Sequence, residues 1–571
     1  MPTTTVPAFA FALLALSAFQ PFSFSAFSSA SAPPPPRPDY SIAGIVQPAR
    51  AAGGVKSADA DLAASIGSAQ LLYTGDGAGL RAVLAARNRL KLTTPVIVYM
   101  GGITTNPATD IADLEKNYRS AIAMTPVAKL TGDIDATATR FTLMRADPAG
   151  DAIAVKASTA DVSEKGSSTK FSFWLRIDDE LMRVTAVDVG ISTGNAVVVN
   201  PASWFVTVER AYASTVAAAH KSGALTLGPV YLGNRDQLDA ARHSNSWPGG
   251  PDCLRYALDP RQPAAQKFKG NLITGFMREG YDGAWLDTFQ PRPYNFCDAL
   301  GRKIAFFWDF KTRKLYTHDT YLEAIKEYIR GLRSVARAAT GREPVLFANS
   351  ASGSYATGTK ELFDHGATRD LLDGYCFEDS YLRVDATRDK KSHGAAQAAF
   401  RPITGAAWFS RLANHADAAS AGLRAYCMAG PAGYLAQYIN DAQPNYAQLL
   451  RYAYASFLLT VTKERTTMFG WPMHVSESKT SLGIVPWPRV FYAGLGDPLQ
   501  PNDIAKLKLP DSPCYQRRFE NALVIVNPSD AGAPPATVTI PAGYLDAMTN
   551  KPAPTSLTIP AADAAILLRA P

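Results

Sequence analysis

The sequence predicts an α/β protein: a (β/α)8 barrel that carries a small inserted β domain and ends in an antiparallel β domain. Short apolar segments alternate with helix-like segments from about residue 60 to residue 510, which is typical of a parallel sheet covered by helices. The apolar segments number eight, the number that closes such a barrel. The alternation stops at 126–226 and again after residue 510, where apolar and polar residues take turns as in antiparallel strands.

The eight predicted barrel strands are short apolar runs, most of them followed by a turn or a polar residue. They cover 69–73, 95–100, 254–258, 283–286, 344–347, 373–377, 423–428 and 466–470. Between them, apolar residues at three- and four-residue spacing predict helices over 77–90, 110–123, 263–279 and 319–339. An open, doubly wound sheet is the alternative arrangement. We prefer the barrel because the glycine-rich turn at 75–79 lacks the GxGxxG spacing of a nucleotide-binding sheet.

The N-terminal residues predict a targeting segment followed by a linker. Pro7–Phe19 is an apolar run with the length of a signal-peptide core, too short to span a bilayer, and small residues follow at 28–32. No Lys or Arg precedes Arg37, so the basic start of a typical signal is missing. We expect residues 1–32 to direct secretion, with an organelle presequence as the alternative, and residues 33–59 to form a Pro/Ala-rich linker.

Residues 126–226 predict a β domain inserted between two parts of the barrel, 60–125 and 227–510. Its stretch IDDELMRV resembles a short β module of phage-tail and surface-associated proteins. The acidic triplet Asp178–Glu180 in this stretch favours a hairpin turn over a catalytic role. Similar period-two segments at 511–571 predict the C-terminal antiparallel β domain.

Composition and charge exclude several classes of protein. The 571 residues are 47% hydrophobic and 19% charged, with a net charge of +7 spread along the chain. We therefore expect a globular core and no nucleic-acid partner. No later segment is a long uncharged apolar stretch, so we expect no stable membrane span. The 5 cysteines and 7 histidines form no CxxC, HxxxH or HxH group, so we expect no metal site and no cofactor. Calcium held by carboxylates from distant segments stays open.

The odd number of cysteines leaves at least one thiol unpaired within the chain. Cys376 and Cys427 fall in neighbouring predicted strands, and we expect both to be buried free thiols. Cys253 and Cys297 are the alternative pair for a disulfide bond.

Polar side chains follow several of the predicted strands. Asp259, Asp287, Asn349 and the neighbours Glu378 and Asp379 stand at or just after the C-terminal end of a strand. Working residues of (β/α)8 barrels lie at these ends, so we expect the five side chains to gather on one rim. Two carboxyl groups there suit hydrolysis of a glycosidic bond, in which one is the acid and the other the nucleophile or base. Separations of about 5–5.5 Å favour retention of configuration, and about 6.5–9.5 Å favour inversion.

The sequence around the fourth predicted strand, GYDGAWLDTF, resembles the corresponding motif of retaining glycoside hydrolase barrels. It is similar to polygalactosaminidase-like and other hypothetical glycosyl hydrolases, and more distantly to the alpha-galactosidase and alpha-glucosidase clan. The resemblance implies that Asp287 is the nucleophile. It also implies that the acid/base carboxylate ends the sixth strand, where Glu378 stands in DGYCFEDSYL. Asp379 is the alternative acid, because strand alternation decides which neighbour faces the barrel axis.

Aromatic residues near the same loops are candidates to stack on sugar rings beside the polar residues Asp259, Asn349 and Asp379. They are Trp247, Phe289, Tyr294, Trp308, Tyr381 and Trp471. Tyr99 ends the second predicted strand, and we expect it to line the floor of the substrate site. The sequence therefore predicts a glycoside hydrolase that cleaves a poly- or oligosaccharide by a retaining two-carboxylate mechanism. The alternative is a non-catalytic carbohydrate-binding or surface adhesion protein on a barrel scaffold, suggested by the inserted β module and the predicted export.

Overall fold

The computed structural model of the chain describes residues 37–48, 56–74, 77–105, 117–145, 154–156, 174–188, 192–193, 196–198, 203–232, 255–289, 293, 296–298, 303–349, 371–384, 400–430, 445–478 and 481–570. The predicted targeting segment 1–32, Trp247 and Cys253 lie outside these residues.

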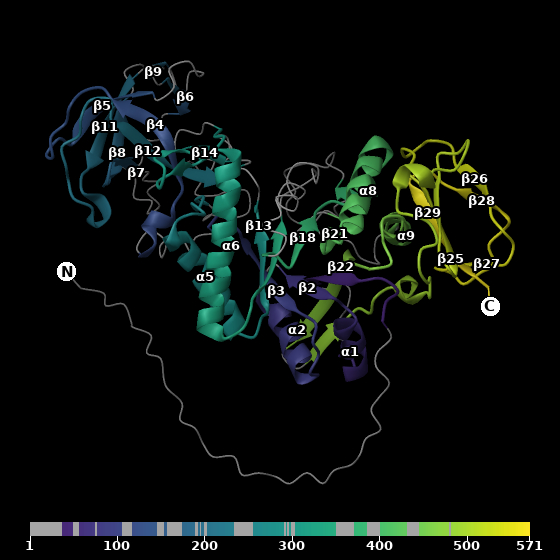
Figure 1. Ribbon diagram of the computed structural model, residues 1–571. Coiled ribbons are helices and arrows are strands. Elements are labelled where there is room, and N and C mark those ends of the chain that lie inside the picture. Colours follow the sequence, from purple (N-terminus) through teal and green to yellow (C-terminus); the bar gives the residue numbers. More distant parts are fainter. Residues whose placement is uncertain are drawn as a thin grey trace, which may run out of the picture. The chain divides into compact units, whose positions relative to one another are not determined.

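Within the described residues, eight parallel strands pair in a closed ring, and several of them are labelled in the middle of Figure 1. In order around the ring they are β1 (Ile42–Pro48), β2 (Leu71–Thr74), β3 (Val96–Gly101), β13 (Gly283–Asp287), β17 (Val345–Asn349), β18 (Gly374–Phe377), β21 (Ala425–Met428) and β22 (Thr467–Ser478). β22 pairs in parallel with β1, which closes the ring, and β23 (Ser481–Ile484) adds an antiparallel hairpin to β22. The predicted (β/α)8 TIM barrel is confirmed, and an open sheet is excluded.

The strands are staggered as in other TIM barrels. The registers of the eight strand pairs, followed from Ile45 of β1 once around the ring, lead back to β1 at residue 37. The stagger is therefore 45 − 37 = 8 residues. A shear of about eight tilts the strands so that their inward side chains stack in layers and fill the interior.

Two predictions about the barrel strands are wrong, and they compensate for each other. Residues 42–48, expected within the linker, form β1, and residues 42–46 are all buried. The apolar run is short and follows a Pro/Ala-rich segment, which concealed it. The described part of the expected strand 254–258 makes only isolated antiparallel bridges. One strand is gained and one is lost before β13, so Asp287 still ends the fourth strand and Glu378 still follows the sixth.

Helices lie between the barrel strands. In the described residues they are α1 (Asp59–Gly67), α2 (Gly77–Arg89), α5 (Pro263–Arg278), α6 (His318–Thr340), α8 (Gly405–Ser420) and α9 (Tyr446–Leu458). The described end of the helix expected over 110–123 is a single 3-10 turn, η1 (Arg119–Ala121). Other 3-10 turns are η3 (Tyr212–Ser214), η5 (Arg489–Tyr492) and η6 (Ile504–Leu507).

α6 shows why such a segment forms a helix. At its start, Thr317 and Thr320 exchange side-chain and backbone hydrogen bonds, which satisfies N–H groups that have no partner within the helix. At its end, Gly341 has a φ of 70°, a conformation that glycine adopts at little cost. The buried face of α6 packs along α5, where Gly270 faces Val335 with no room for a side chain.

Inward-facing side chains fill the interior of the barrel. A cluster contributed by all eight strands contains Ala43, Ile45, Leu71, Ile97, Trp285, Phe347, Cys376, Tyr426, Met428 and Met468. Outward-facing residues of the same strands join a second cluster with the helices. Because side chains alternate along a strand, the next inward position after Trp285, Phe347 and Cys376 is two residues further on. These positions hold Asp287, Asn349 and Glu378.

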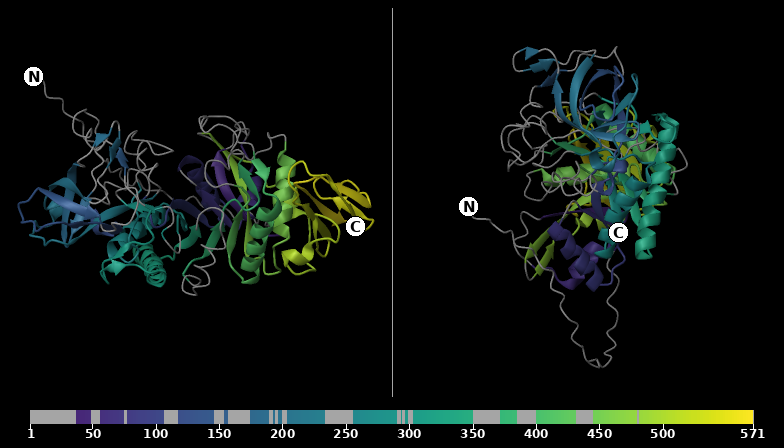
Figure 2. Two further views of the ribbon diagram at one scale, coloured as in Figure 1. Left: turned by 90° about the horizontal axis from the view of Figure 1, so that it is seen from above. Right: turned by 90° about the vertical axis from the view of Figure 1, so that its left-hand side faces the viewer.

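The insertion after β3 contains a closed antiparallel barrel of its own. Six described strands pair in a ring: β12 (Leu225–Leu232), β4 (Met124–Leu130), β5 (Arg140–Arg145), β11 (Ser203–Glu209), β8 (Glu180–Asp188) and β7 (Trp174–Ile177), which pairs back to β12. β14 (Phe296–Asp298) extends the sheet beside β12, and β6 (Ala154–Lys156), β10 (Ala196–Val198) and β9 (Ser192–Thr193) form a separate small sheet. Figure 2 shows these strands in two further views. The six strands of this ring run from residue 124 to 232, slightly beyond the expected 126–226.

The C-terminal residues form antiparallel sheets, as their patterning predicts. β24 (Tyr515–Arg518), β25 (Ala522–Asn527), β29 (Asp563–Arg569) and β27 (Tyr544–Asp546) make one sheet, and β26 (Ala536–Thr539) and β28 (Ser556–Ile559) make another. Two-stranded pairs also occur within 303–402, namely β15 (Trp308–Asp309) with β16 (Lys314–Leu315) and β19 (Leu382–Val384) with β20 (Phe400–Pro402). α9 packs on β25 and β29, and Arg451 of α9 forms an ion pair of 2.6 Å with Asp563 of β29.

The prediction of buried free thiols is confirmed for Cys376 in β18 and Cys427 in β21. The alternative pairing of Cys253 with Cys297 stays a prediction, because Cys253 lies outside the described residues. In the part of the chain that the structure describes, no helix is long and apolar enough to cross a membrane, and no group of three His, Cys, Asp or Glu side chains is placed to hold a metal ion.

Candidate active site

Three neighbouring strands bring together a carboxyl group, an amide and a second carboxyl group. Asp287 ends β13, Asn349 ends β17 and Glu378 follows β18, and these strands pair side by side in that order. All three residues follow the inward-facing pattern of the barrel interior. The group therefore lies at the C-terminal mouth of the barrel, where enzymes of this fold carry out their chemistry.

Asn349 connects the two carboxyl groups. Its side-chain Nδ2 donates one hydrogen bond to Oδ1 of Asp287 at 3.1 Å and another to Oε1 of Glu378 at 2.5 Å. Two oxygen atoms bonded to one nitrogen are separated by no more than the sum of these distances, 5.6 Å. This limit applies to one oxygen atom of each carboxyl group, and it is compatible with the spacing of about 5–5.5 Å between the carboxyl groups of retaining glycosidases.

Asp287 accepts two further hydrogen bonds. The Tyr99 hydroxyl and the Thr288 hydroxyl, the latter at 3.1 Å, both donate to its Oδ2. Burial raises the pKa of Tyr99 far above its ordinary value, and the negative charge of Asp287 raises it further. Tyr99 therefore stays protonated and remains a donor. Together with Asn349, these donors hold the Asp287 carboxyl group in a fixed orientation.

The surroundings of Glu378 favour the protonated form of its carboxyl group. Burial raises the pKa of its carboxyl from 4.5 to about 8, and the charge of Asp287 contributes to the rise. The hydrogen bond from Asn349 lowers the pKa and so opposes both effects. One carboxyl group of the pair therefore holds a proton near neutral pH while its neighbour accepts hydrogen bonds, which is the arrangement that acid and nucleophile require.

The backbone takes a left-handed conformation directly after each of the two carboxyl residues. Thr288, directly after Asp287, has a φ of 55°, and Asp379, directly after Glu378, has a φ of 49°. A β-branched residue in this left-handed region is an outlier, and such strain gathers at functional sites. The turn at Thr288 brings its hydroxyl to Asp287, while the Phe289 N–H donates to the Asn349 carbonyl at 2.8 Å.

The two neighbours Glu378 and Asp379 are separated by strand alternation. Glu378 follows the inward-facing Cys376 at a two-residue spacing and is bonded to Asn349. Asp379 instead interacts electrostatically with Arg411 of α8, and burial raises the pKa of its carboxyl. The geometry therefore places Glu378 beside Asp287.

Two polar residues expected to bind substrate, Asp259 and Asn349, are buried. Asp259 is fully buried, and it accepts hydrogen bonds from the Tyr316 hydroxyl at 2.7 Å and the Arg261 N–H at 3.1 Å. It does not end a barrel strand, because 256–258 form only isolated bridges, so it is not part of the site. Asn349 belongs to the site, but its side chain is 1% exposed and offers almost no surface to a ligand.

The expected sugar-stacking role is wrong for three of the aromatic residues. Phe289, Tyr381 and Trp471 are at most 1% exposed and belong to the hydrophobic core. Phe289 stacks on Tyr328, Tyr381 packs edge-on against His415, and Trp471 stacks on Phe469. Sequence position alone did not show that these rings are buried in the hydrophobic core. Tyr99 lies in the site, where its hydroxyl binds Asp287, and Trp247 and Tyr294 lie outside the described residues.

Thr288 is the site residue that the sequence did not suggest. Its position after Asp287 in LDTF was the only available signal, and the contact depends on the left-handed turn. Arg411, the charge partner of Asp379, gave no signal, because it lies 32 residues away on a helix.

No family model and no curated protein matches the sequence. Similar solved structures include the glycoside hydrolase domain of PelA from Pseudomonas aeruginosa, at 8% identity over 76% of this chain and 95% of that chain, with a TM-score of 0.31. The trehalose-6-phosphate hydrolase TreA from Bacillus licheniformis is 9% identical over 93% of this chain and 99% of that chain, with a TM-score of 0.42. The GH31 dextranase FjDex31A from Flavobacterium johnsoniae is 10% identical over 94% of this chain and 52% of that chain, with a TM-score of 0.33. Similarity at this level carries no argument about function, which therefore rests on the site itself.

Proposed function

We propose that this protein is a retaining glycoside hydrolase that cleaves a poly- or oligosaccharide, with Asp287 as nucleophile and Glu378 as acid/base. The observation that supports the proposal is the Asn349 side chain bonded to both carboxyl groups at the mouth of the barrel. It limits the separation of one oxygen atom of each carboxyl group to a distance compatible with a covalent intermediate. Both carboxyl residues keep part of their surface exposed, so a substrate can reach them.

The proposed reaction has two steps. In the first, Asp287 forms a bond to the anomeric carbon while the bond to the leaving sugar breaks, and the Glu378 proton passes to the leaving oxygen. In the second, Glu378 is a carboxylate and takes a proton from water. The resulting hydroxide adds to the anomeric carbon and releases Asp287. The raised pKa of Glu378, about 8, keeps the proton available for the first step at neutral pH.

We further propose that the substrate is extracellular. This proposal depends on the apolar segment Pro7–Phe19 and the small residues after it, which have the pattern of a secretion signal. Mass spectrometry of the culture medium and of the N-terminus of the mature chain would test it.

The function is tested with Asp287→Asn and Glu378→Gln on a panel of polysaccharides and on aryl glycosides with an activated leaving group. Asp287→Asn should abolish activity on both, because no covalent intermediate can form. Glu378→Gln should lose activity on natural glycosides but keep more of its glycosylation rate on the activated substrate, which needs little acid help. Azide should then partly restore turnover and give a glycosyl azide of retained configuration.

The matched control is Asp282→Asn. Asp282 precedes the same strand β13 at its opposite end, where it accepts a hydrogen bond from the Val96 N–H at 2.8 Å. It should keep the specific activity of the folded wild type. Equal activity of Asp287→Asn and wild type would refute the assignment. A folded wild type that binds sugars and cleaves none of them would favour a carbohydrate-binding protein instead.

A further inference from the structure

We propose that Asn349 is a positioning residue that ties the two catalytic carboxyl groups together and governs when Glu378 releases its proton. This inference rests on the proposed function, and it assigns Asn349 to the carboxyl pair instead of to the sugar. The decisive observation is its place on β17, the strand between those that carry Asp287 and Glu378.

The burial of Asn349 argues against direct contact with substrate. Its side chain is 1% exposed, whereas Asp287 and Glu378 are partly exposed. A sugar hydroxyl therefore reaches the carboxyl groups and not the amide. The main chain at Asn349 is also held to the segment after β13, because its backbone carbonyl accepts a hydrogen bond from the Phe289 N–H at 2.8 Å.

The chemistry of the amide suits this task. An Asn side chain has two N–H donors on one nitrogen, and Nδ2 donates to both carboxyl groups. Like charges this close repel each other, so without the shared donor the two groups would separate or hold a proton more tightly. Asp in place of Asn has nearly the same shape but would add a third carboxyl group, so an amide suits this position better than a carboxylate.

The hydrogen bond also has a predictable effect on proton release. A donor to the charged form of a carboxyl group lowers its pKa, and the bond from Asn349 lowers the pKa of Glu378 against the opposite effects of burial and Asp287. Loss of the amide should therefore raise the pKa of Glu378 above about 8. The acid would keep its proton to higher pH and would be slower to act as base in the second step.

The test compares Asn349→Ala and Asn349→Asp with the control Asn527→Ala. Asn527 of β25 is also fully buried and donates through Nδ2 to the Ile559 carbonyl at 3.0 Å, in the C-terminal sheets. We expect both Asn349 variants to lower kcat about 10- to 100-fold, as for loss of a hydrogen bond to a charged group, with KM little changed. The basic limb of the pH profile should move to higher pH. The folded fraction of Asn527→Ala should keep the wild-type kcat and pH profile.

A second measurement does not need activity. The infrared band of the protonated Glu378 carboxyl, identified as the difference between wild type and Glu378→Gln, should persist to higher pH in Asn349→Ala than in wild type. If the wild-type protein proved inactive on every glycoside but the band still persisted to higher pH in Asn349→Ala, the positioning role would be supported and the glycosidase proposal would fail. An active wild type whose Asn349 variants change KM alone, with band and pH limb unmoved, would overturn the positioning role and make Asn349 a substrate contact.

Discussion

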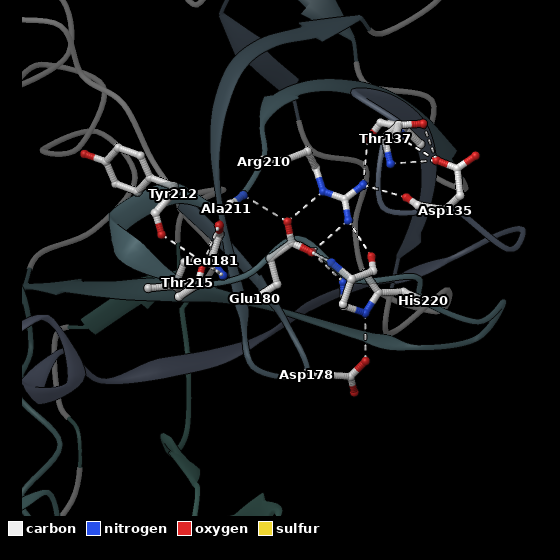
Figure 3. A network of polar contacts seen from close by, with 12 residues as sticks. Asp135, Thr137, Asp178, Glu180, Leu181, Arg210, Ala211, Tyr212, Thr215 and His220 are labelled. Atoms are coloured by element: carbon white, nitrogen blue, oxygen red, sulfur yellow. Dashed lines mark hydrogen bonds and ion pairs between the residues drawn. The ribbon is translucent and has the colours of Figure 1, made fainter.

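Glu180 in the inserted β-barrel and Glu378 in the (β/α)8 barrel are both carboxyl groups within hydrogen-bond networks, and their surroundings favour opposite protonation states. Figure 3 shows Glu180 facing Arg210 and His220. Arg210 donates to both of its oxygens at 2.7 Å, and the Ala211 and Ala218 N–H groups each donate at 3.0 Å. Glu378 receives a hydrogen bond from Asn349, and its charged neighbour is the carboxylate of Asp287.

The pKa values follow from these neighbours. Burial alone would raise the pKa of Glu180, but the bonds from Arg210, from the two backbone N–H groups and from His220 lower it to about 2. Burial and Asp287 raise the pKa of Glu378 to about 8. A carboxyl group surrounded by hydrogen-bond donors stays ionised and stabilises the fold. A carboxyl group beside a second carboxyl group can hold a proton and transfer it. This difference distinguishes a structural site from a catalytic one.

The largest expected effect contrasts activity with stability at Glu378. Glu378→Gln should lower kcat/KM on natural glycosides by about 10²- to 10⁴-fold, the usual contribution of general acid catalysis. The same change should raise the free energy of unfolding at pH 7, because it removes a carboxyl group that burial and Asp287 disfavour. Urea unfolding beside steady-state kinetics measures both quantities. If the variant loses stability together with activity, Glu378 stabilises the fold as Glu180 does, and the proposed difference between the two carboxyl groups is contradicted.

The next effect concerns the folding of the insertion. Arg210→Met should lower the free energy of unfolding by about 3–5 kcal/mol, because it leaves the fully buried Glu180 without its charge partner. The control is Arg183→Met in the same domain. Arg183 pairs with Glu209 at 3.6 Å on the surface, and its removal should cost at most about 1 kcal/mol. Urea melts, with amide hydrogen exchange of β8 and β11, would locate the loss. Equal effects of the two variants would contradict the role of the Glu180 network.

The pH dependence of stability should separate the two carboxyl groups. The pKa of Glu180 is lowered from 4.5 to about 2, so its stabilisation is present above about pH 4.5 and is lost as the pH falls toward 2. The pKa of Glu378 is raised from 4.5 to about 8, so its contribution is fully present below about pH 4.5 and is lost as the pH rises through 8. We would measure the free energy of unfolding against pH for wild type, Glu180→Gln and Glu378→Gln. Glu180→Gln should lack the loss of stability at acid pH, and Glu378→Gln should lack the loss at alkaline pH. A Glu378→Gln curve with an unchanged alkaline limb would contradict the raised pKa.

The sequence predicted the barrel because most strands are short apolar runs that end at polar residues, as β13 does at Asp287 and β17 does at Asn349. It missed β1, whose apolar residues 42–46 follow a Pro/Ala-rich segment, and the compensating false strand at 254–258 preserved the numbering of the strands that matter. The ends of strands can be predicted from the sequence because turn-forming and polar residues stand directly next to them in the chain.

The roles of particular side chains depended on long-range geometry. The choice between Glu378 and Asp379 required knowing that Cys376 faces inward. The burial of Asn349 and the left-handed turn at Thr288 come from the packing of neighbouring strands, which no local pattern records. The triplet Asp178–Glu180 was expected at a hairpin turn, and residues 178–179 do form that turn. Glu180 is nevertheless the buried centre of a network that draws Arg210 and His220 from residues 30 and 40 positions away.

The smallest expected effect tests the neighbour of Glu378. Asp379 interacts electrostatically with Arg411, whereas Glu378 receives the hydrogen bond from Asn349, so Asp379→Asn should change kcat/KM by less than about tenfold, far below the loss expected for a general acid. Its charge nevertheless raises the pKa of Glu378 slightly. Removing that charge should move the basic limb of the pH profile to lower pH, opposite to the shift expected for Asn349→Ala. Kinetics on natural and activated glycosides over pH 5–10 would measure both shifts. If Asp379→Asn instead loses natural substrates and keeps activated ones, Asp379 is the acid, and only the assignment of Asp287 survives.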